Sequence, residues 1–213
     1  MAISAADVGA PRRLRADAAR NRQRLIDAAA EVFAARGLDA TLDDIARHAG
    51  VNVATAYRHF ANKHELAHEF LRQCVDSAVT TAEEATAEPD PWTGLTQFLE
   101  RSLDMIASNR ALVDVLTRAY GAEHFAEMLQ RSWGPLEELL ARGRAAGVVR
   151  ADVGVTDFPP ILEMLGSVTG HGQPSLPHRY IGLILAGLRP DPEPLPGEPI
   201  TRERLLELVA AKG

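Results

Sequence analysis

Three helix-capping residues, spaced ten or eleven residues apart, constrain the fold of this chain more than any other feature. Thr41, Asn52 and Asn62 carry side-chain oxygens of the kind that accept backbone N–H groups at the start of a helix. Their spacing predicts short helices over residues 42–48 and 53–60, and a longer helix from about 62 to 86. Short capped helices with connections of three or four residues are typical of a helix-turn-helix unit.

The residues between the caps predict a fixed corner between the two short helices. Asp44 and Glu65 each stand three residues after a capping residue, which is the spacing of a capping box. Gly50 permits a sharp turn with a positive φ, and Val51 is expected to fill the corner. We therefore expect the orientation of the 53–60 helix to be set by local contacts.

Apolar periodicity predicts which side of each helix is buried. A helix over residues 18–36 carries an apolar stripe of helical period, formed by Leu25, Ala28, Ala29, Val32 and Phe33. The residues expected to pack against this stripe are Ile45, Ala46, Ala56 and Phe60. The side of the 53–60 helix left exposed holds Val53, Ala54, Thr55 and Arg58. A helix with such a small, mixed face fits the major groove of DNA.

The segment TLDDIARHAGVNVATAYRHFANK, residues 41–63, resembles the DNA-binding signature of the TetR family of bacterial transcriptional regulators. The run over residues 22–37 is also similar to that family, and the resemblance extends over about residues 20–70. The matching positions are Thr41, Ile45, Ala46, Ala49, Gly50, Val51, Thr55, Tyr57, His59, Phe60, Lys63 and Leu66. Two positions depart from the pattern. Asn52 replaces a common Ser and caps equally well, whereas Ala54 replaces a common Gly and holds the backbone farther from the base edges.

The resemblance implies a DNA-binding regulator, and most often a repressor that a small molecule releases from a palindromic operator. It implies phosphate contacts from Thr41, Tyr57, His59 and Lys63, to which we add the exposed Arg58. The expected base readers are Val53, Ala54 and Thr55, because methyl groups suit thymine methyls and a hydroxyl can donate or accept. Tyr57 could instead be a core aromatic residue, and we interpret its ring as packed with the hydroxyl outward.

Charge is concentrated at the N-terminal end of the chain. The net charge is −6, yet residues 1–72 hold 11 basic and 9 acidic residues, and residues 12–24 hold six arginines and one acid. Such a basic segment can bind phosphate while an acidic remainder keeps the protein in solution. The alternative is a solvated basic tail.

A second motif competes for the start of the 62–86 helix. His64, Glu65 and His68 match the H-E-x-x-H pattern of helix-borne zinc proteases, so a zinc-dependent hydrolase is the alternative function. Catalytic zinc needs a third protein ligand, and no extended form of the motif follows. Glu65 and Leu66 also have a cap role and a core role in the helix-turn-helix interpretation. We therefore expect no metal and no enzymatic activity.

The whole sequence predicts an all-α fold. Helices are expected over residues 92–108, 110–120, 122–146, 156–169, 178–188 and 201–211, with a loop over 170–177 and a proline-rich, extended segment over 190–199. The predicted organisation is a flexible basic arm (residues 1–16), a three-helix helix-turn-helix DNA-binding domain (17–65) and a helical ligand-sensing and dimerisation domain (66–213).

Residues 180–188 of the helix expected over 178–188 are apolar nearly all round, so this stretch must be buried by its own domain and by a second copy of the chain or by its own domain alone. We predict a homodimer interface that includes Leu165, Tyr180, Gly182, Leu183 and Ala186, because a palindromic operator requires a two-fold protein. Gly182 and Ala186 are four residues apart, and Gly166 and Gly170 repeat that spacing. An ordinary core helix is the alternative.

A small-molecule effector pocket is expected among the helices between residues 70 and 170. Bulky apolar residues for it are Phe98, Met105, Tyr120, Phe125, Met128, Trp133 and Met164, and His124 and His171 could orient a polar ligand atom. Each of these residues could equally belong to the core or the surface.

Several classes of protein are not indicated by the sequence. It has no phosphate-binding loop, no nucleophile elbow and no paired cysteine cluster, so we expect no cofactor. The single Cys74 fits a reducing compartment, and the longest apolar run, 181–188, is too short to cross a bilayer. The expected partners are operator DNA, a second copy and an effector, with no membrane, in the cytoplasm.

Overall fold

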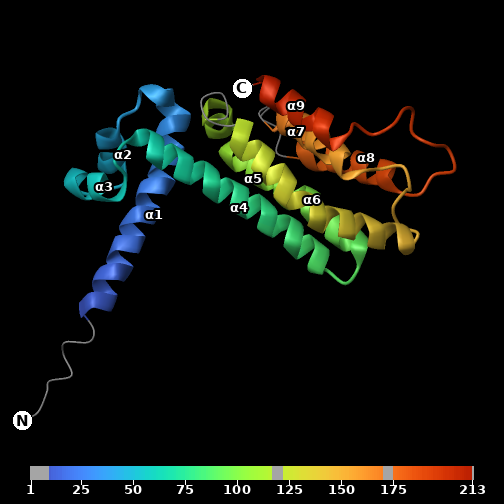
Figure 1. Ribbon diagram of the computed structural model, residues 1–213, viewed down its shortest axis with the longest axis horizontal. Helices are drawn as coiled ribbons and strands as arrows, with labels where there is room; N and C mark the ends of the chain where they lie inside the picture. Colours follow the sequence, from blue (N-terminus) through green and yellow to red (C-terminus); the bar gives the residue numbers. More distant parts are fainter. Residues whose placement is uncertain (1–9, 117–121, 170–174, 213) are drawn as a thin grey trace, which may run out of the picture. The chain divides into compact units, whose positions relative to one another are not determined.

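The computed structural model describes residues 10–116, 122–169 and 175–212, and its chain divides into two compact units, residues 1–71 and 72–213. Every regular element within these described ranges is a helix, which confirms the all-α prediction (Figure 1). Helix α4 (Lys63–Ala87) begins in the first unit and ends in the second.

The N-terminal unit contains α1 (Ala10–Arg36), the short η1 (Gly37–Asp39), α2 (Leu42–His48), α3 (Val53–His59) and the start of α4. The predicted start of the first helix at residue 18 was wrong, because α1 begins at Ala10. Pro11 stands in the first turn of α1, where a missing N–H breaks no helical bond. No glycine or proline follows before Gly37, so nothing in this sequence interrupts the helix.

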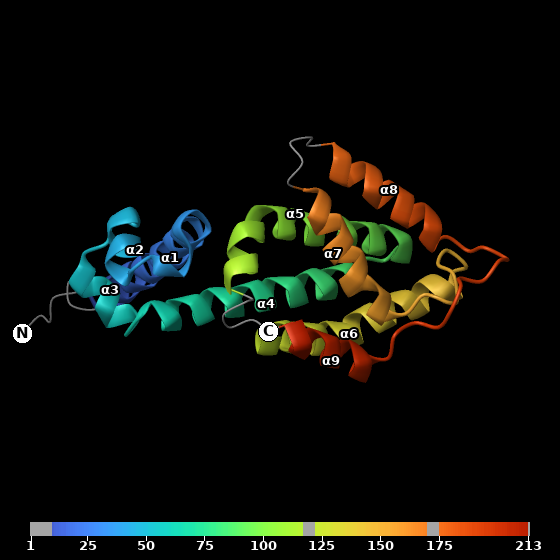
Figure 2. The same ribbon diagram turned by 90° about the horizontal axis from the view of Figure 1, so that it is seen from above.

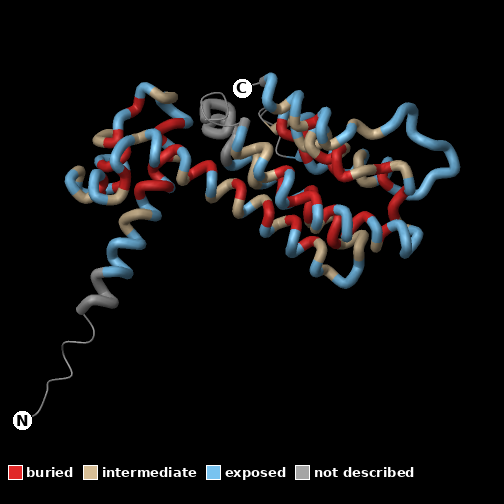
Figure 3. The backbone as a smooth tube through the Cα atoms, in the orientation of Figure 1, coloured by how far each residue is buried: buried red, intermediate tan, exposed pale blue. Residues whose placement is uncertain are grey.

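The core of the N-terminal unit forms where α1, α2, α3 and the first turns of α4 meet (Figure 3). Its fully buried side chains are Leu25, Ala29, Phe33, Ala40, Ile45, Ala46, Ala56, Phe60, Leu66 and Ala67. The inward faces predicted for the helices over residues 18–36, 42–48 and 53–60 are therefore confirmed. Burial of Phe33, Ile45 and Phe60 stabilises this unit by about 1.5–3 kcal/mol per side chain.

Within the described residues, the second unit contains the remainder of α4 and five further α-helices. These are α5 (Pro91–Leu116), α6 (Ala122–Ala145), α7 (Phe158–Val168), α8 (Leu176–Leu188) and α9 (Arg202–Lys212), with a short η3 (Val155–Asp157) before α7. The predicted helix break near residue 109 was wrong, because α5 runs through Ser108 and Asn109 without interruption. Neither residue lacks a backbone donor, and local polarity alone does not end a helix.

The predicted loop over 170–177 is shorter than expected. Residues 170–174 lie outside the described part of the chain, and α8 already begins at Leu176, with Pro177 in its first turn. The predicted start of this helix at residue 178 was therefore late by two positions, because proline is well accommodated at the beginning of a helix.

The core of the second unit joins α4, α5, α6 and α7. Leu95, Leu99, Leu139 and Phe158 are almost completely buried, and the Phe98 and Phe158 rings meet edge to face at 5.7 Å. Helix α9 lies along α6 in both views (Figure 2). Leu205 of α9 is buried, and the guanidinium of Arg202 lies 4.8 Å from the centre of the Trp133 ring.

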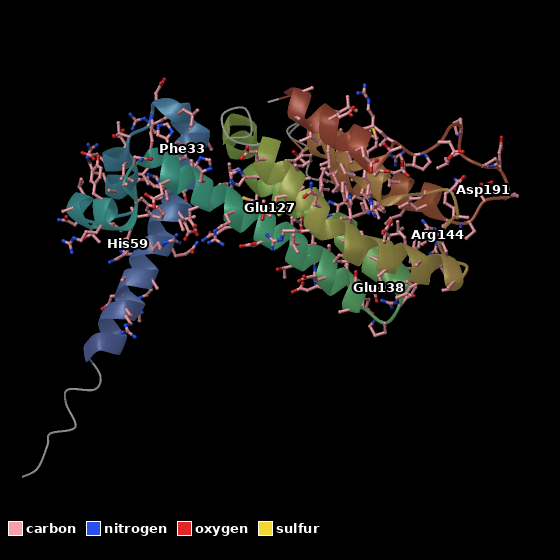
Figure 4. The ribbon with its side chains drawn as sticks, viewed as in Figure 1. Phe33, His59, Glu127, Glu138, Arg144 and Asp191 are labelled. Atoms are coloured by element: carbon pink, nitrogen blue, oxygen red, sulfur yellow. The ribbon has the colours of Figure 1, made fainter. Side chains whose placement is uncertain are left out.

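The proline-rich segment between α8 and α9 is held by one buried arginine. Arg150 donates to both carboxylate oxygens of Asp152, at 2.5 and 3.0 Å, and to the backbone carbonyls of Gly187 and Glu193. The Leu195 N–H donates to the same Asp152 carboxylate at 2.7 Å. The hydrogen bond from Arg150 lowers the pKa of Asp152 well below its usual value. The segment is thereby fastened at Glu193 and Leu195, and Asp191, which precedes them, is exposed (Figure 4).

Candidate nucleic-acid interface

The start of α2 is closed by a complete capping box. The Thr41 hydroxyl oxygen accepts the Asp44 N–H at 3.1 Å, and the Asp44 carboxylate accepts the Thr41 N–H at 3.1 Å. The Thr41 hydroxyl also donates to that carboxylate at 2.7 Å. These hydrogen bonds to Thr41 lower the pKa of Asp44 to about 2. Thr41 therefore acts first as a helix cap.

The corner between α2 and α3 has the geometry that the sequence predicts. Gly50 adopts a φ of +61°, and the Val51 N–H returns to the Ala46 carbonyl at 2.9 Å. Val51 is buried, and the Asn52 side chain accepts the Ala54 N–H at 2.9 Å. The first residue of α3 thus follows directly from a turn with fixed backbone hydrogen bonds.

The start of α4 differs in one detail from the predicted capping box. Asn62 accepts the N–H groups of His64 and Glu65 at 2.9 and 3.0 Å, which confirms it as the cap. The Glu65 carboxylate, however, accepts the N–H of Ala61 at 2.7 Å rather than that of Asn62. The return bond therefore reaches one residue further back than a capping box requires.

The face of α3 that the sequence assigns to DNA is open. Ala54 is exposed, Val53 and Thr55 are partly exposed, and Ala56 on the opposite side is completely buried. Tyr57 is 51% exposed and Arg58 is exposed, whereas His59 lies partly exposed at the end of the helix (Figure 4). The helix thus presents small residues flanked by hydrogen-bond donors.

Two of the predicted phosphate donors bind acceptors of their own unit. The Thr41 hydroxyl binds Asp44, and the Lys63 ammonium donates to the Leu38 carbonyl. The neighbouring Asp43 carboxylate, as a hydrogen-bond acceptor and a negative charge, raises the pKa of Tyr57. Asp43 carried no signal in the sequence, because its role depends on where α2 places it beside α3.

The basic segment is used differently from its predicted role. Arg20 pairs with Asp17, and Arg22 pairs with Glu69 at 2.9 Å while its guanidinium lies 5.0 Å from the Phe60 ring centre. Arg24 donates to the Ala49 carbonyl at 2.5 Å. At least these arginines have partners inside the unit, so the run of positive charge overstates the number of free phosphate ligands.

The zinc interpretation of His64, Glu65 and His68 gains no support. The Glu65 carboxylate binds the backbone at the start of α4. Within the described ranges, no group of three or more histidine, cysteine, aspartate or glutamate side chains is placed to hold a metal ion. Two residues of the pattern thus have roles in the helix-turn-helix, Glu65 at the cap and Leu66 in the core.

The predicted interface residues of the second unit separate into two groups. Tyr180, Gly182, Leu183 and Ala186 are exposed along α8, with Leu183 exposed to 58%. Leu165 is buried among side chains of its own unit, beside Leu103 and Ile181, and so offers no outward surface. Gly166 is also used internally, because a Cβ there would lie 2.9 Å from Ile106. Gly170 lies outside the described residues.

The predicted effector-pocket residues are likewise dispersed. Phe98 and Trp133 are buried core residues, Met105, His124, Phe125 and Met128 are partly buried, and Met164 is 60% exposed. Tyr120 and His171 lie outside the described part of the chain. A groove of about 370 Å³ opens on this unit, and its lining includes Ile161 and Met164 of α7, Ile184 and Gly187 of α8, and Leu195. The only one of the predicted residues in that lining is Met164.

A capped helix-turn-helix joined through a long helix to a second helical unit defines the class of helix-turn-helix regulators. Residues 25–70 match the family described as "Bacterial regulatory proteins, tetR family", and residues 90–190 match the family described as "Transcriptional regulator SbtR-like, C-terminal domain". The chain belongs to the TetR family.

Solved structures agree with this assignment over most of the chain. The TetR transcription regulatory protein from Mycobacterium vanbaalenii is 35% identical, covers 83% of this chain and 99% of its own, and has a TM-score of 0.63. The TetR transcriptional regulator SCO0520 from Streptomyces coelicolor is 30% identical, covers 79% of this chain and 98% of its own, and has a TM-score of 0.64.

Relatives found by sequence match a shorter part. The helix-turn-helix-type transcriptional regulators TtgW and SrpR, both from Pseudomonas putida, are each 55% identical over 56 residues, 26% of this chain. The matched segment spans 42% of TtgW and 26% of SrpR.

None of the helices in the described residues has the length and apolar character that a membrane span requires.

Proposed function

We propose that this protein is a transcriptional repressor that binds a near-palindromic DNA operator as a homodimer and is released by a small molecule. The observation that carries the proposal is the face of α3: Ala54, Tyr57 and Arg58 are exposed, while Ala56 and Phe60 are buried in the opposite direction. A recognition helix of this kind enters the major groove with its N-terminal residues toward the bases.

Base discrimination is assigned to Val53, Ala54 and Thr55. Their methyl groups can contact thymine methyls, and the Thr55 hydroxyl can donate or accept at a base edge. Phosphate contacts are assigned to Thr41, Tyr57, Arg58, His59 and Lys63. An ammonium group has three donors, so Lys63 can keep its bond to the Leu38 carbonyl and still bind a phosphate.

Dimerisation is assigned to the outward face of α8. Leu183 and Tyr180 are 58% and 40% exposed, and their spacing of three residues places them on the same side of α8. A Cβ at Gly182 would meet nothing within 4 Å, so a second helix can approach closely there. Leu165 supports this face from inside the unit and is not part of the proposed contact.

Release by an effector requires that the ligand favours a dimer with a different spacing of the two α3 helices. A complete switch needs about 5.5 kcal/mol of differential affinity between the two states. The second unit supplies apolar side chains for such a ligand, including those that line the groove between α7, α8 and Leu195.

The direct test is selection of duplex DNA from a random pool by the purified full chain, with light scattering to measure its mass. A near-palindromic consensus bound by a dimer, with half-sites about 34–36 Å apart, is expected. A monomer that retains no duplex preferentially, even in dilute salt, would refute the proposal.

Two variants separate the proposed roles on the selected duplex. Lys63→Ala is expected to weaken binding to every sequence and to lower the salt slope by about one unit. Thr55→Ala is expected mainly to relax sequence preference, by about 1–3 kcal/mol at the contacted base pair. Arg204→Ala, an exposed change on α9, is the charge-matched control for Lys63→Ala. Parental binding by both variants at several salt concentrations would remove the site assignment.

A further inference from the structure

One arginine of α1 reaches the corner of the helix-turn-helix. The Nη2 atom of Arg24 lies 2.5 Å from the Ala49 carbonyl oxygen and 3.4 Å from the Gly50 carbonyl oxygen. Both acceptors belong to the turn between α2 and α3, 25 and 26 residues along the chain. The guanidinium therefore ties the first helix to the corner that precedes the recognition helix.

The two acceptors are groups that a cation stabilises. Ala49 is the C-terminal cap of α2, and the last carbonyls of a helix have no partner within it. They also form the negative end of the helix dipole, where a positive side chain is favourable. The Arg24 guanidinium therefore satisfies the carbonyl groups at this end of α2 and places a positive charge beside them.

Gly50 fits the same arrangement for a second reason. Its φ of +61° favours glycine, and a Cβ at this position would lie 2.9 Å from Arg24 Nη2. A side chain here would push the guanidinium away from the Ala49 carbonyl. The glycine and the arginine are therefore complementary parts of one corner.

We propose that Arg24 is a positioning residue for α3, which sets the corner for base recognition instead of binding a phosphate. This proposal rests on the proposed function. Phosphate contacts position a protein on DNA without reading sequence, whereas base contacts require the recognition helix in a defined place. A residue that fixes the corner should thus affect discrimination more than general affinity.

The experiment compares Arg24→Gln with Arg20→Gln in the full chain. Arg20 lies on the same helix and pairs with Asp17 of that helix, so the control removes an equal charge without touching the corner. Binding is measured for the selected duplex and for a scrambled duplex of equal composition, at four salt concentrations and well below the melting temperature of each variant.

Arg24→Gln is expected to lose about 10-fold in affinity for the selected duplex and less than about 2-fold for the scrambled one. Its salt slope should stay close to that of Arg20→Gln. Arg24→Lys, which keeps the charge and an N–H donor on a shorter side chain, should recover part of the selected-duplex affinity. Equal losses on both duplexes, with a slope lowered by about 0.9, would make Arg24 a phosphate ligand and overturn the proposal.

Amide hydrogen exchange tests the corner without DNA. Arg24→Gln should increase exchange about 10-fold over residues 47–55 and leave residues 66–71 unchanged. A lower melting temperature with parental discrimination and parental exchange at the corner would reduce Arg24 to general structural support and overturn the proposal. If the parent chain selects no duplex, the proposed function fails, and the exchange measurement still decides whether Arg24 holds the corner.

Discussion

The short helices of the N-terminal unit and the longer helices of the second unit differ in what specifies them. In the N-terminal unit α2 and α3 have seven residues each, Thr41, Asn52 and Asn62 begin helices, and Arg24 binds the end of α2. In the second unit Asp90 and Thr201 also cap helices, but α5 to α9 have 11 to 26 residues and are held by apolar burial, and Arg142 and Arg150 bind the carbonyls of connecting segments. Short helices need their ends specified, whereas long amphipathic helices are specified by the core they bury.

Removal of one core ring in each unit is expected to change the stability of that unit most. Phe60 is 1% exposed, and Phe60→Ala is expected to lower the free energy of unfolding of the N-terminal unit by about 3–5 kcal/mol. Because the short helices α2 and α3 have little stability alone, unfolding of this unit should also abolish operator binding. Denaturant unfolding followed by circular dichroism measures the change.

Phe98→Ala is the matched control, because Phe98 is 5% exposed and packs on Phe158 in the second unit. It should destabilise the second unit to a similar extent and leave hydrogen exchange in α2 and α3 unchanged. If each variant increases hydrogen exchange equally in both units, the two units do not unfold separately, and their stabilities cannot be assigned to different contacts.

An intermediate effect is expected from the polar contacts of the second unit. Asp152→Ala leaves the buried Arg150 guanidinium without its carboxylate and removes the acceptor for the Leu195 N–H. Since Asp152 is about one third exposed, we expect a smaller loss of stability than the removal of one partner from a fully buried pair causes. Calorimetry measures it, and Glu198→Ala, an exposed change on the same segment, is the control. An unchanged melting temperature would show that the segment needs no such fastening.

The smallest effect tests the helix caps. Thr41→Ala should lower the free energy of unfolding by about 1 kcal/mol through loss of the cap. The pKa of Asp44 is lowered from 3.8 to about 2, so its contribution is present above about pH 4 and lost as the pH falls to 2. The melting temperature should therefore fall less between pH 5 and pH 2 for Asp44→Asn than for the parent. An equal fall in both proteins would contradict the stabilising role of the Thr41–Asp44 capping box.

The fold of the N-terminal unit could be predicted because its signals are local. The capping box of Thr41 and Asp44, the cap at Asn52 and the positive φ of Gly50 each depend on residues within four positions. The same locality explains the successful assignment of Ala56 and Phe60 to the core. The family resemblance added the expected contacts to DNA, which remain predictions.

Other features could not be predicted, because they depend on residues that meet only after folding. The sequence indicates no partner for Arg22 or Arg24, because their partners lie 47 and 25 residues further along the chain. Leu165 carries the same apolar signal as Leu183, and only the packing of α5, α7 and α8 places one inside and the other outside. Spacing along one helix does not say which neighbour covers it.

The link between α8 and α9 has a consequence for handling the protein. It lies just beyond the segment that matches the C-terminal family, and it is anchored on both sides: by Arg150 near its start, and by the burial of Leu205 and the pairing of Arg202 with Glu137 after its end. A protease that nicks the exposed prolines between these anchors would cut the polypeptide without releasing the last helix. The two fragments would co-elute as one intact species on a sizing column, and only a denaturing gel would reveal the break.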